Sequence, residues 1–320
     1  MIFRGHDEAW GHWREALTSN RMHHAWILAG REGIGKGHFA RAAAAELVAE
    51  PGMPQPAIQQ HPDIIVLDHL PANETEEAKR ADGKPWQARR NITIDQIRRM
   101  QQRLTTRPTL GNRRVVIVDP ADDMEKNAVN ALLKSLEEPP SGTYFILVAH
   151  RPGRLLPTIR SRCRILRFAP LPDAEVDAVL RAEAPQADQA ARIAAVTAAE
   201  GSPGTALAFI DEKLGEIHRI MRGIITEGDP QLSFRGALAE EIGARPGRDR
   251  MAAVIELARA MVSGAVPDAG RERQLRLIEA HVALTRLSAQ APTFNFDPGL
   301  LALEIGGLLA AAAMPREAAS

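Results

Sequence analysis

Cysteine is nearly absent from the chain, since Cys163 is the only one among 320 residues. A single thiol excludes an internal disulfide framework and a zinc site built from several cysteines, and it is typical of a reducing compartment. Long apolar runs are missing as well: no stretch of about 18 apolar residues occurs, and the N-terminal MIFRGHDEAW lacks the apolar core of a signal peptide. We therefore expect a cytoplasmic protein without a metal site or a membrane partner.

Neither sign of charge is in excess, because 40 Lys and Arg balance 40 Asp and Glu. Such a chain does not hold nucleic acid by overall positive charge, and any DNA contact requires a local basic patch. Aromatic residues make up only 4% of the chain against 45% for all hydrophobic residues, so burial depends mainly on Ala, Leu, Ile and Val. This composition favours packed helices over an all-β sandwich.

Four short apolar runs alternate with amphipathic helical stretches. They are Ala25–Gly30, Ile64–Leu67, Val115–Val118 and Tyr144–Ala149. Strands that alternate with helices form a parallel sheet with helices on both faces. Residues 70–90 are polar and lack periodicity, which predicts an exposed connection. After Phe168 the strand-like runs stop and only helical patterns follow.

Residues 30–37, GREGIGKG, lie between the first apolar run and an Ala-rich helical segment. Gly30, Gly35 and Lys36 match the phosphate-binding pattern GxxxxGK, with Gly33 inside the loop. Backbone N–H groups and a helix N-terminus surround phosphate oxygens in such a loop, and the lysine reaches the outer phosphates. Gly37 stands where Ser or Thr would give a hydroxyl to Mg²⁺. We therefore expect that the protein requires no cofactor. Two interpretations of the loop stay open: it binds ATP or ADP without hydrolysis, or it is a plain Gly-rich turn between a strand and a helix.

Asp119 ends the third apolar run, in the manner of a Walker B strand whose carboxylate helps to hold Mg²⁺. The next position, which carries the water-activating Glu in active ATPases, is Pro120, and proline has no side-chain base. Asp122 and Asp123 follow beyond the strand end. We expect these two carboxylates to cap the helix that begins nearby.

Two further motifs carry a specific resemblance. Residues 130–140 read NALLKSLEEPP, and Ser161-Arg162-Cys163 follows about 20 residues after them. Together they resemble the clamp-loader family of AAA+ proteins, over a region from about residue 22 to residue 209 that includes the His61-Pro62-Asp63 turn and the segment GSPGTAL.

The resemblance implies that Arg162 is an arginine finger, which reaches the γ-phosphate of ATP held by an adjacent subunit. A planar, permanently charged guanidinium suits this role, because it bridges phosphoryl oxygens and offsets charge in the transition state. A surface arginine in a basic turn is the alternative. For Cys163 we favour packing over reactivity, because no basic partner for the thiol is evident.

Departures from the family pattern indicate which kind of subunit the chain resembles. Gly37, Pro120 and, in GSPGTAL, Thr205 stand where a hydrolysing subunit carries a hydroxyl, a glutamate and an arginine. Catalytic parts are lost while the finger remains, which resembles a non-hydrolysing subunit. Two other readings stay open: an active P-loop ATPase, such as the motor subunit of the same loader, or a DNA-binding or scaffold module without a nucleotide role.

The resemblance also implies an architecture and partners. We expect an α/β P-loop core with a parallel sheet over residues 1–168, a small helical lid over 169–211, and an all-α collar domain for oligomerisation over 212–320. The implied partners are motor subunits of the gamma/tau type, a delta subunit, the sliding clamp and primer-template DNA.

One helix offers a local basic patch. In residues 95–106, Arg99 and Arg103 lie one turn apart, on a different face from the apolar stripe of this segment. The alternatives are phosphate contact with DNA inside the assembled loader and a merely solvated polar face.

Overall fold

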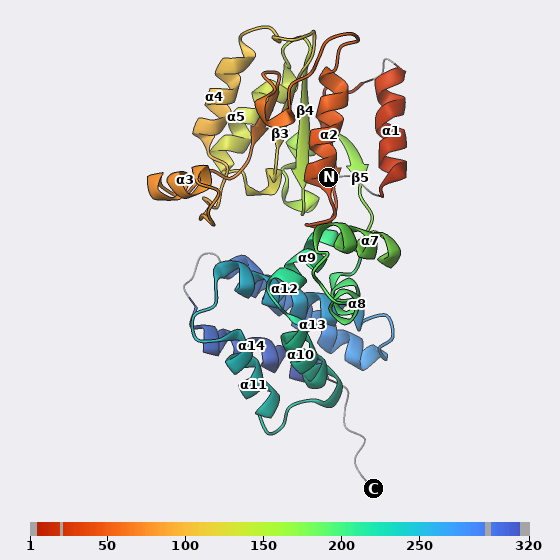
Figure 1. The fold of residues 1–320 in the computed structure, drawn as a ribbon, viewed down its shortest axis with the longest axis vertical. Coiled ribbons are helices and arrows are strands. Elements are labelled where there is room, and N and C mark those ends of the chain that lie inside the picture. The colour runs from red at the N-terminus through yellow and green to blue at the C-terminus, as the bar shows by residue number, and fades with distance from the viewer. Residues whose placement is uncertain (1–4, 20–21, 292–295, 314–320) are drawn as a thin grey trace. The chain divides into compact units, whose positions relative to one another are not determined.

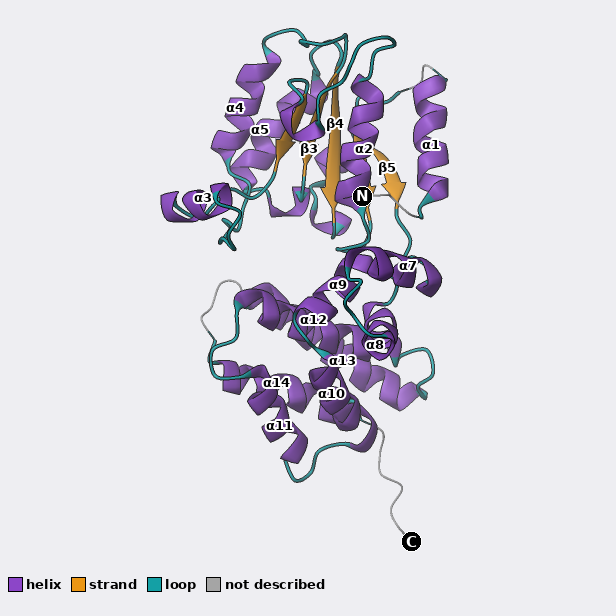
Figure 2. Cartoon of the chain, in the orientation of Figure 1, coloured by secondary structure: helices purple, strands orange, loops and turns teal. Residues whose placement is uncertain are grey.

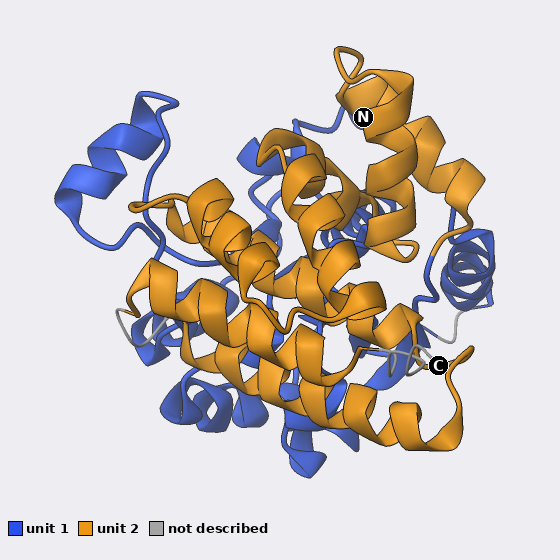
Figure 3. Ribbon diagram, turned by 90° about the horizontal axis from the view of Figure 1, so that it is seen from below, with its two compact units in different colours: residues 1–170 blue, residues 171–320 orange. Residues whose placement is uncertain are grey.

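The computed structural model describes residues 5–19, 22–291 and 296–313. The expected outer ends of the first and last domains, residues 1–4 and 314–320, lie outside this part of the chain. The chain divides into two compact units, residues 1–170 and residues 171–320, which Figure 3 colours separately.

The first unit contains a five-stranded sheet in which all strand pairs are parallel (Figure 2). The strand order is β2-β3-β4-β1-β5. The strands are β1 Ala25–Ala29, β2 Ile64–Leu67, β3 Arg114–Val118, β4 Thr143–Ala149 and β5 Arg164–Arg167. The four predicted strands are therefore confirmed. The sequence did not reveal β5, because its residues Arg-Ile-Leu-Arg are mostly exposed at the sheet edge and form no apolar run.

Helices cover both faces of this sheet, as predicted for a parallel sheet with buried strands. Successive residues of β1 point to opposite faces: Ile27 packs in a core with α4 and α5, and Trp26 packs in a core with α1 and α2. Figure 1 shows the two pairs of helices on either side of the strands. The helices of this unit are α1 Asp7–Thr18, α2 Lys36–Val48, α3 Glu74–Ala81, α4 Ile94–Leu104, α5 Lys126–Glu137 and α6 Pro157–Arg160.

The polar segment at residues 70–90 is not merely an irregular connection. It contains α3, whose N-cap Asn73 accepts a hydrogen bond from the backbone N–H of Glu76. The carboxylate of Glu76 in turn accepts the N–H of Gln87 at 2.6 Å, which ties the returning chain to the helix. Sequence periodicity missed α3 because the helix is only eight residues long and almost wholly polar.

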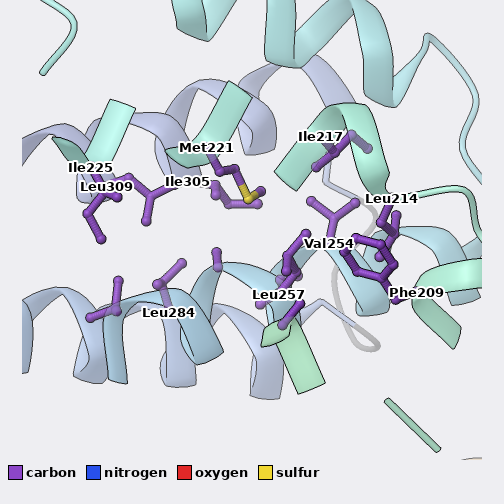
Figure 4. Close-up of a cluster of buried hydrophobic side chains, with 14 of the residues drawn as sticks. Phe209, Leu214, Ile217, Met221, Ile225, Val254, Leu257, Leu284, Ile305 and Leu309 are labelled. Atoms are coloured by element: carbon purple, nitrogen blue, oxygen red, sulfur yellow. The ribbon is translucent and has the colours of Figure 1, made fainter. Parts of the chain in front are cut away.

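The second unit is helical, and its described residues contain no strand, as predicted. Its helices are α7 Asp173–Glu183, α8 Gln189–Ala199, α9 Pro203–Asp211, α10 Gly215–Glu227, α11 Ser233–Ile242, α12 Arg248–Gly264, α13 Arg271–Gln290 and α14 Pro298–Ala311. One hydrophobic core joins them, part of which Figure 4 shows. Phe209 and Leu214, on either side of residue 211, both belong to this core. A division between lid and collar at that residue remains a prediction.

No helix in the described part of the chain is both long enough and apolar enough to cross a membrane.

Candidate functional site

The predicted phosphate loop connects β1 to α2, as the motif requires. Gly33 and Gly35 have φ angles of 75° and 97°, in the left-handed region that glycine adopts most readily. Gly30 is needed for space: a Cβ atom there would lie 2.6 Å from the carbonyl oxygen of Phe168. The glycines therefore let the backbone turn sharply at the carboxyl end of β1 and start α2 at Lys36.

Lys36 is the charged residue of the loop, and only 2% of its surface is exposed. Its Nζ donates a hydrogen bond to the carbonyl oxygen of Arg31 in the same loop. Burial lowers the pKa of Lys36 to about 8, although the nearby carboxylates of Glu32, Asp119 and Asp122 favour its charged form. The ammonium group is thus enclosed by the loop that would surround a phosphate.

Asp119 lies at the carboxyl end of β3, beside the loop, as the Walker B pattern predicts. Its Oδ2 atom is 2.9 Å from Nη1 of Arg41, on the second turn of α2. The same Nη1 donates to the carbonyl oxygen of Gly37 at 3.0 Å. Arg41 was not predicted from the sequence, because its partner Asp119 is 78 positions away.

These groups do not fit the Mg²⁺ ion that complete phosphate loops bind. Gly37 supplies no hydroxyl, and a Cβ atom at this position would lie 2.6 Å from Asp119 Oδ2 and 3.0 Å from Arg41 Nη1. The carboxylate that would hold the metal is already paired with a guanidinium. The side chains of Asp119 and Arg41 therefore occupy the space of the metal site, and the guanidinium pairs with the carboxylate that would bind the ion.

The expectation that Asp122 and Asp123 cap the following helix is wrong. Helix α5 begins at Lys126 with Glu125 as its N-cap residue, and no side chain caps it. Asp122 Oδ2 instead accepts the backbone N–H groups of His150 and of Arg151, the latter at 3.1 Å. Asp123 pairs with a histidine two residues beyond the end of β2. A 3₁₀ turn over residues 121–123 and extended backbone at residue 124 separate both residues from the start of the helix.

Arg162 lies near the amino-terminal ends of the strands, whereas the phosphate loop lies at their carboxyl-terminal ends. It precedes β5, whose first residue Arg164 is in register with Trp26 near the start of β1, whereas the loop follows the end of β1. One strand length, about 15 Å for five residues, separates the two edges. Arg162 Nη2 is 2.7 Å from Glu137 Oε1, and Nη1 donates to the carbonyl oxygen of Thr158 at 2.9 Å.

The sequence also singled out two arginines on α4 and Cys163, which directly follows Arg162. Arg99 and Arg103 are exposed on α4, and Nη2 of Arg103 donates to the carbonyl oxygen of Pro62 at 2.9 Å. Cys163 packs against the core shared with α4 and α5, and burial raises the pKa of its thiol to about 12. The packing interpretation of Cys163 is confirmed.

Several known proteins are similar to this chain in sequence. A family model described as DNA polymerase III, delta subunit, matches residues 5–172. The chain is 34% identical over 252 residues to the DNA polymerase III subunit delta′ of Pseudomonas aeruginosa, covering 73% of this chain and 69% of that protein. It is 40% identical over 125 residues to the subunit delta′ of Escherichia coli, covering 39% and 37% of the two chains.

Other relatives carry a different subunit name. The chain is 30% identical over 204 residues to the DNA polymerase III subunit gamma/tau of Mycobacterium tuberculosis, covering 62% of this chain and 34% of that protein. Among solved structures, a DNA polymerase III gamma subunit-related protein of Thermotoga maritima is 20% identical with a TM-score of 0.47, over 93% and 98% of the two chains.

Proposed function

The chain belongs to the family described as DNA polymerase III, delta subunit, and from this membership we propose that it is a delta-prime-type subunit of a clamp loader. In this role it does not hydrolyse ATP. It supplies Arg162 as an arginine finger to the ATP site of a neighbouring subunit while a sliding clamp is loaded during DNA replication.

The position of Arg162 is the observation that carries the proposal. A side chain at the amino-terminal edge of the sheet cannot reach a phosphate at the carboxyl-terminal edge of the same sheet, about one strand length away. The guanidinium is partly exposed, with 35% of the side chain accessible, and its partner Glu137 is also at the surface. Its chemistry is therefore available to a phosphate on another subunit and not to the chain's own loop.

The chain's own loop supports the absence of hydrolysis. Pro120 stands at the strand end where a general base belongs, and Arg41 neutralises Asp119. These features weigh against the alternative of an active P-loop ATPase or motor subunit. The loop nevertheless keeps its glycine conformations and Lys36, and these favour binding of ATP or ADP without turnover.

The second unit supports a role in assembly. Leu275, Ile278 and Val282 recur at helical spacing along α13, and each is at least half exposed. Exposed apolar side chains on one helix face are typical of a surface that packs against another protein. We assign this region to the collar, in contact with gamma/tau-type motor subunits and a delta subunit, and we place the clamp and primer-template DNA in the same complex.

Reconstitution tests the proposal. The purified chain is mixed with gamma/tau-type and delta subunits, and co-elution and DNA- and clamp-stimulated ATPase are measured with and without it. We expect co-elution, no hydrolysis by the chain alone, and full stimulation only when the chain is present. Hydrolysis by the isolated chain at about 1 per second or faster, a rate typical of enzymes, would contradict the proposal.

A further inference from the structure

Arg41 contacts both Asp119 and Gly37 at the phosphate loop. Arg41 Nη1 lies 2.9 Å from Asp119 Oδ2 and 3.0 Å from the carbonyl oxygen of Gly37. The Cβ atom of any other residue at position 37 would lie 2.6 Å from the same carboxylate oxygen. Gly37 lacks the metal-binding hydroxyl, and because it has no side chain it leaves the space that the Arg41–Asp119 ion pair occupies.

We propose that Arg41 takes the place of the divalent cation at this loop, so that the loop binds nucleotide phosphates independently of metal. The proposal rests on the nucleotide occupancy proposed above and does not depend on Arg162. It names a specificity-determining residue, because Arg41 decides which form of the nucleotide, free or metal-bound, the site accepts.

The chemistry of a guanidinium suits this position. It stays charged at every pH of interest and offers five N–H donors in a planar fork. The bonds to Asp119 and Gly37 both use Nη1. Among the described residues neither Nε nor Nη2 has a hydrogen-bond partner, so these donors can bind a phosphate oxygen. The hydrogen bonds that a guanidinium makes with phosphate are short and strong.

A divalent cation is excluded by the same arrangement. Mg²⁺ needs near-octahedral oxygen ligands, usually a carboxylate and the loop hydroxyl together with the nucleotide. Here the hydroxyl is missing, and the carboxylate of Asp119 is 17% exposed and already paired with Arg41. A divalent ion at this carboxylate would lie beside a like charge in a partly buried site, where repulsion is weakly screened.

Calorimetry with ADP, in the presence of Mg²⁺ and in the presence of EDTA, tests the proposal on the full chain. We expect the wild-type dissociation constant to agree within about twofold between the two conditions. Arg41→Ala should weaken ADP binding in EDTA by about tenfold or more, and Mg²⁺ should restore part of the loss. Arg14→Ala is the matched control. Arg14 lies on α1 and pairs with Glu46 of α2, the helix that carries Arg41, but away from the loop. Its removal should leave ADP binding unchanged.

A gain-of-function variant makes the test two-sided. Combining Arg41→Ala with Gly37→Thr removes the guanidinium and supplies the hydroxyl, so ADP binding should become dependent on Mg²⁺ or Mn²⁺. Melting curves establish whether each variant is folded. If a variant does not fold, the two wild-type titrations, in Mg²⁺ and in EDTA, still test whether ADP binding depends on metal. A tenfold or larger gain of wild-type affinity with Mg²⁺ overturns the role of Arg41 alone. No ADP binding in either condition overturns this role together with the proposed occupancy of the loop.

Discussion

The guanidinium of Arg162 and the carboxylate of Glu137 lie 2.7 Å apart, and this contact joins the two motifs that carry the family resemblance. Glu137 ends α5, and Arg162 follows the short helix α6. Both side chains are partly exposed, and exposed ion pairs stabilise proteins by only about 0–1 kcal/mol. Glu137 therefore orients the guanidinium at the surface without holding it so tightly that a phosphate could not displace the carboxylate.

Replacing Arg162 with alanine should separate function from folding. Because the ion pair is partly exposed, we expect the melting temperature to change by no more than about 3 °C. We expect clamp loading by the assembled complex to fall at least about tenfold, since fingers supplied in trans to small GTPases contribute about 10³–10⁵ in rate. Stimulated ATPase should fall only at the site that faces this subunit.

Two further variants control this experiment. Arg162→Lys keeps the charge but loses the planar fork, so it should restore little of the lost activity. Arg160→Ala removes an exposed arginine from the same turn and should leave clamp loading intact. Normal assembly with wild-type loading by Arg162→Ala would show that Arg162 is not a finger.

The buried ion pair between Asp63 and Arg114 should be essential for the stability of the first unit. Only 1% and 5% of the two side chains are exposed, and Asp63 also accepts the N–H groups of Thr109 and Leu110 at 2.8 Å. Breaking a buried pair leaves an unpaired charge, so Asp63→Ala should lower the free energy of unfolding by about 3–5 kcal/mol. Urea titration measures this loss.

An exposed pair provides the comparison for Asp63. Asp95 and Arg98 on α4 are both more than 60% exposed, and Asp95→Ala should change the free energy of unfolding by less than about 1 kcal/mol. Equal effects of the two substitutions would mean that the buried pair has no special role in stability.

Charge reversal on α4 tests for a DNA surface. If Arg99 and Arg103 contact phosphates, then Arg99→Glu combined with Arg103→Glu should weaken binding of primer-template DNA by the full loader. The slope of log affinity against log salt should fall in magnitude by about 2, one for each phosphate contact. Arg98→Glu is the control, because Arg98 is exposed on the same helix but pairs with Asp95. DNA affinity that is unchanged by the double substitution would rule out this surface.

The thiol of Cys163 should be inert in the folded chain. Burial raises its pKa to about 12, so the reactive thiolate is scarce at any pH at which the protein is handled. We expect alkylation by iodoacetamide at pH 8 to be at least about tenfold slower in native protein than in urea, where the thiol regains its ordinary pKa. Mass spectrometry after timed quenching measures both rates, and equal rates would contradict the packing role.

Local patterns explain why part of this structure could be predicted from the sequence. The strand, loop and helix around Lys36 are encoded in consecutive residues. Each apolar run coincides with a strand because the central positions of buried parallel strands are apolar on both faces. The edge strand β5 and the short helix α3 escaped prediction because neither buries a continuous apolar face. Local pattern is therefore informative only where burial enforces it.

Contacts between distant residues explain the rest. Arg41 and Asp119 are separated by 78 positions, and nothing in either local sequence indicates that the two side chains meet. The capping role expected for Asp122 failed for the same reason. Its partners at residues 150 and 151 come from the end of β4 and are brought close only by the pairing of β3 with β4.

The close contact at Gly37 bears on any attempt to engineer a metal site into this loop. A Cβ atom at position 37 would lie 2.6 Å from the carboxylate of Asp119 and 3.0 Å from the guanidinium of Arg41, and both groups are the ends of flexible side chains. A serine or threonine at this position therefore requires these two side chains to shift. An added hydroxyl and the Arg41–Asp119 ion pair are thus not independent design variables, because changing one displaces the other.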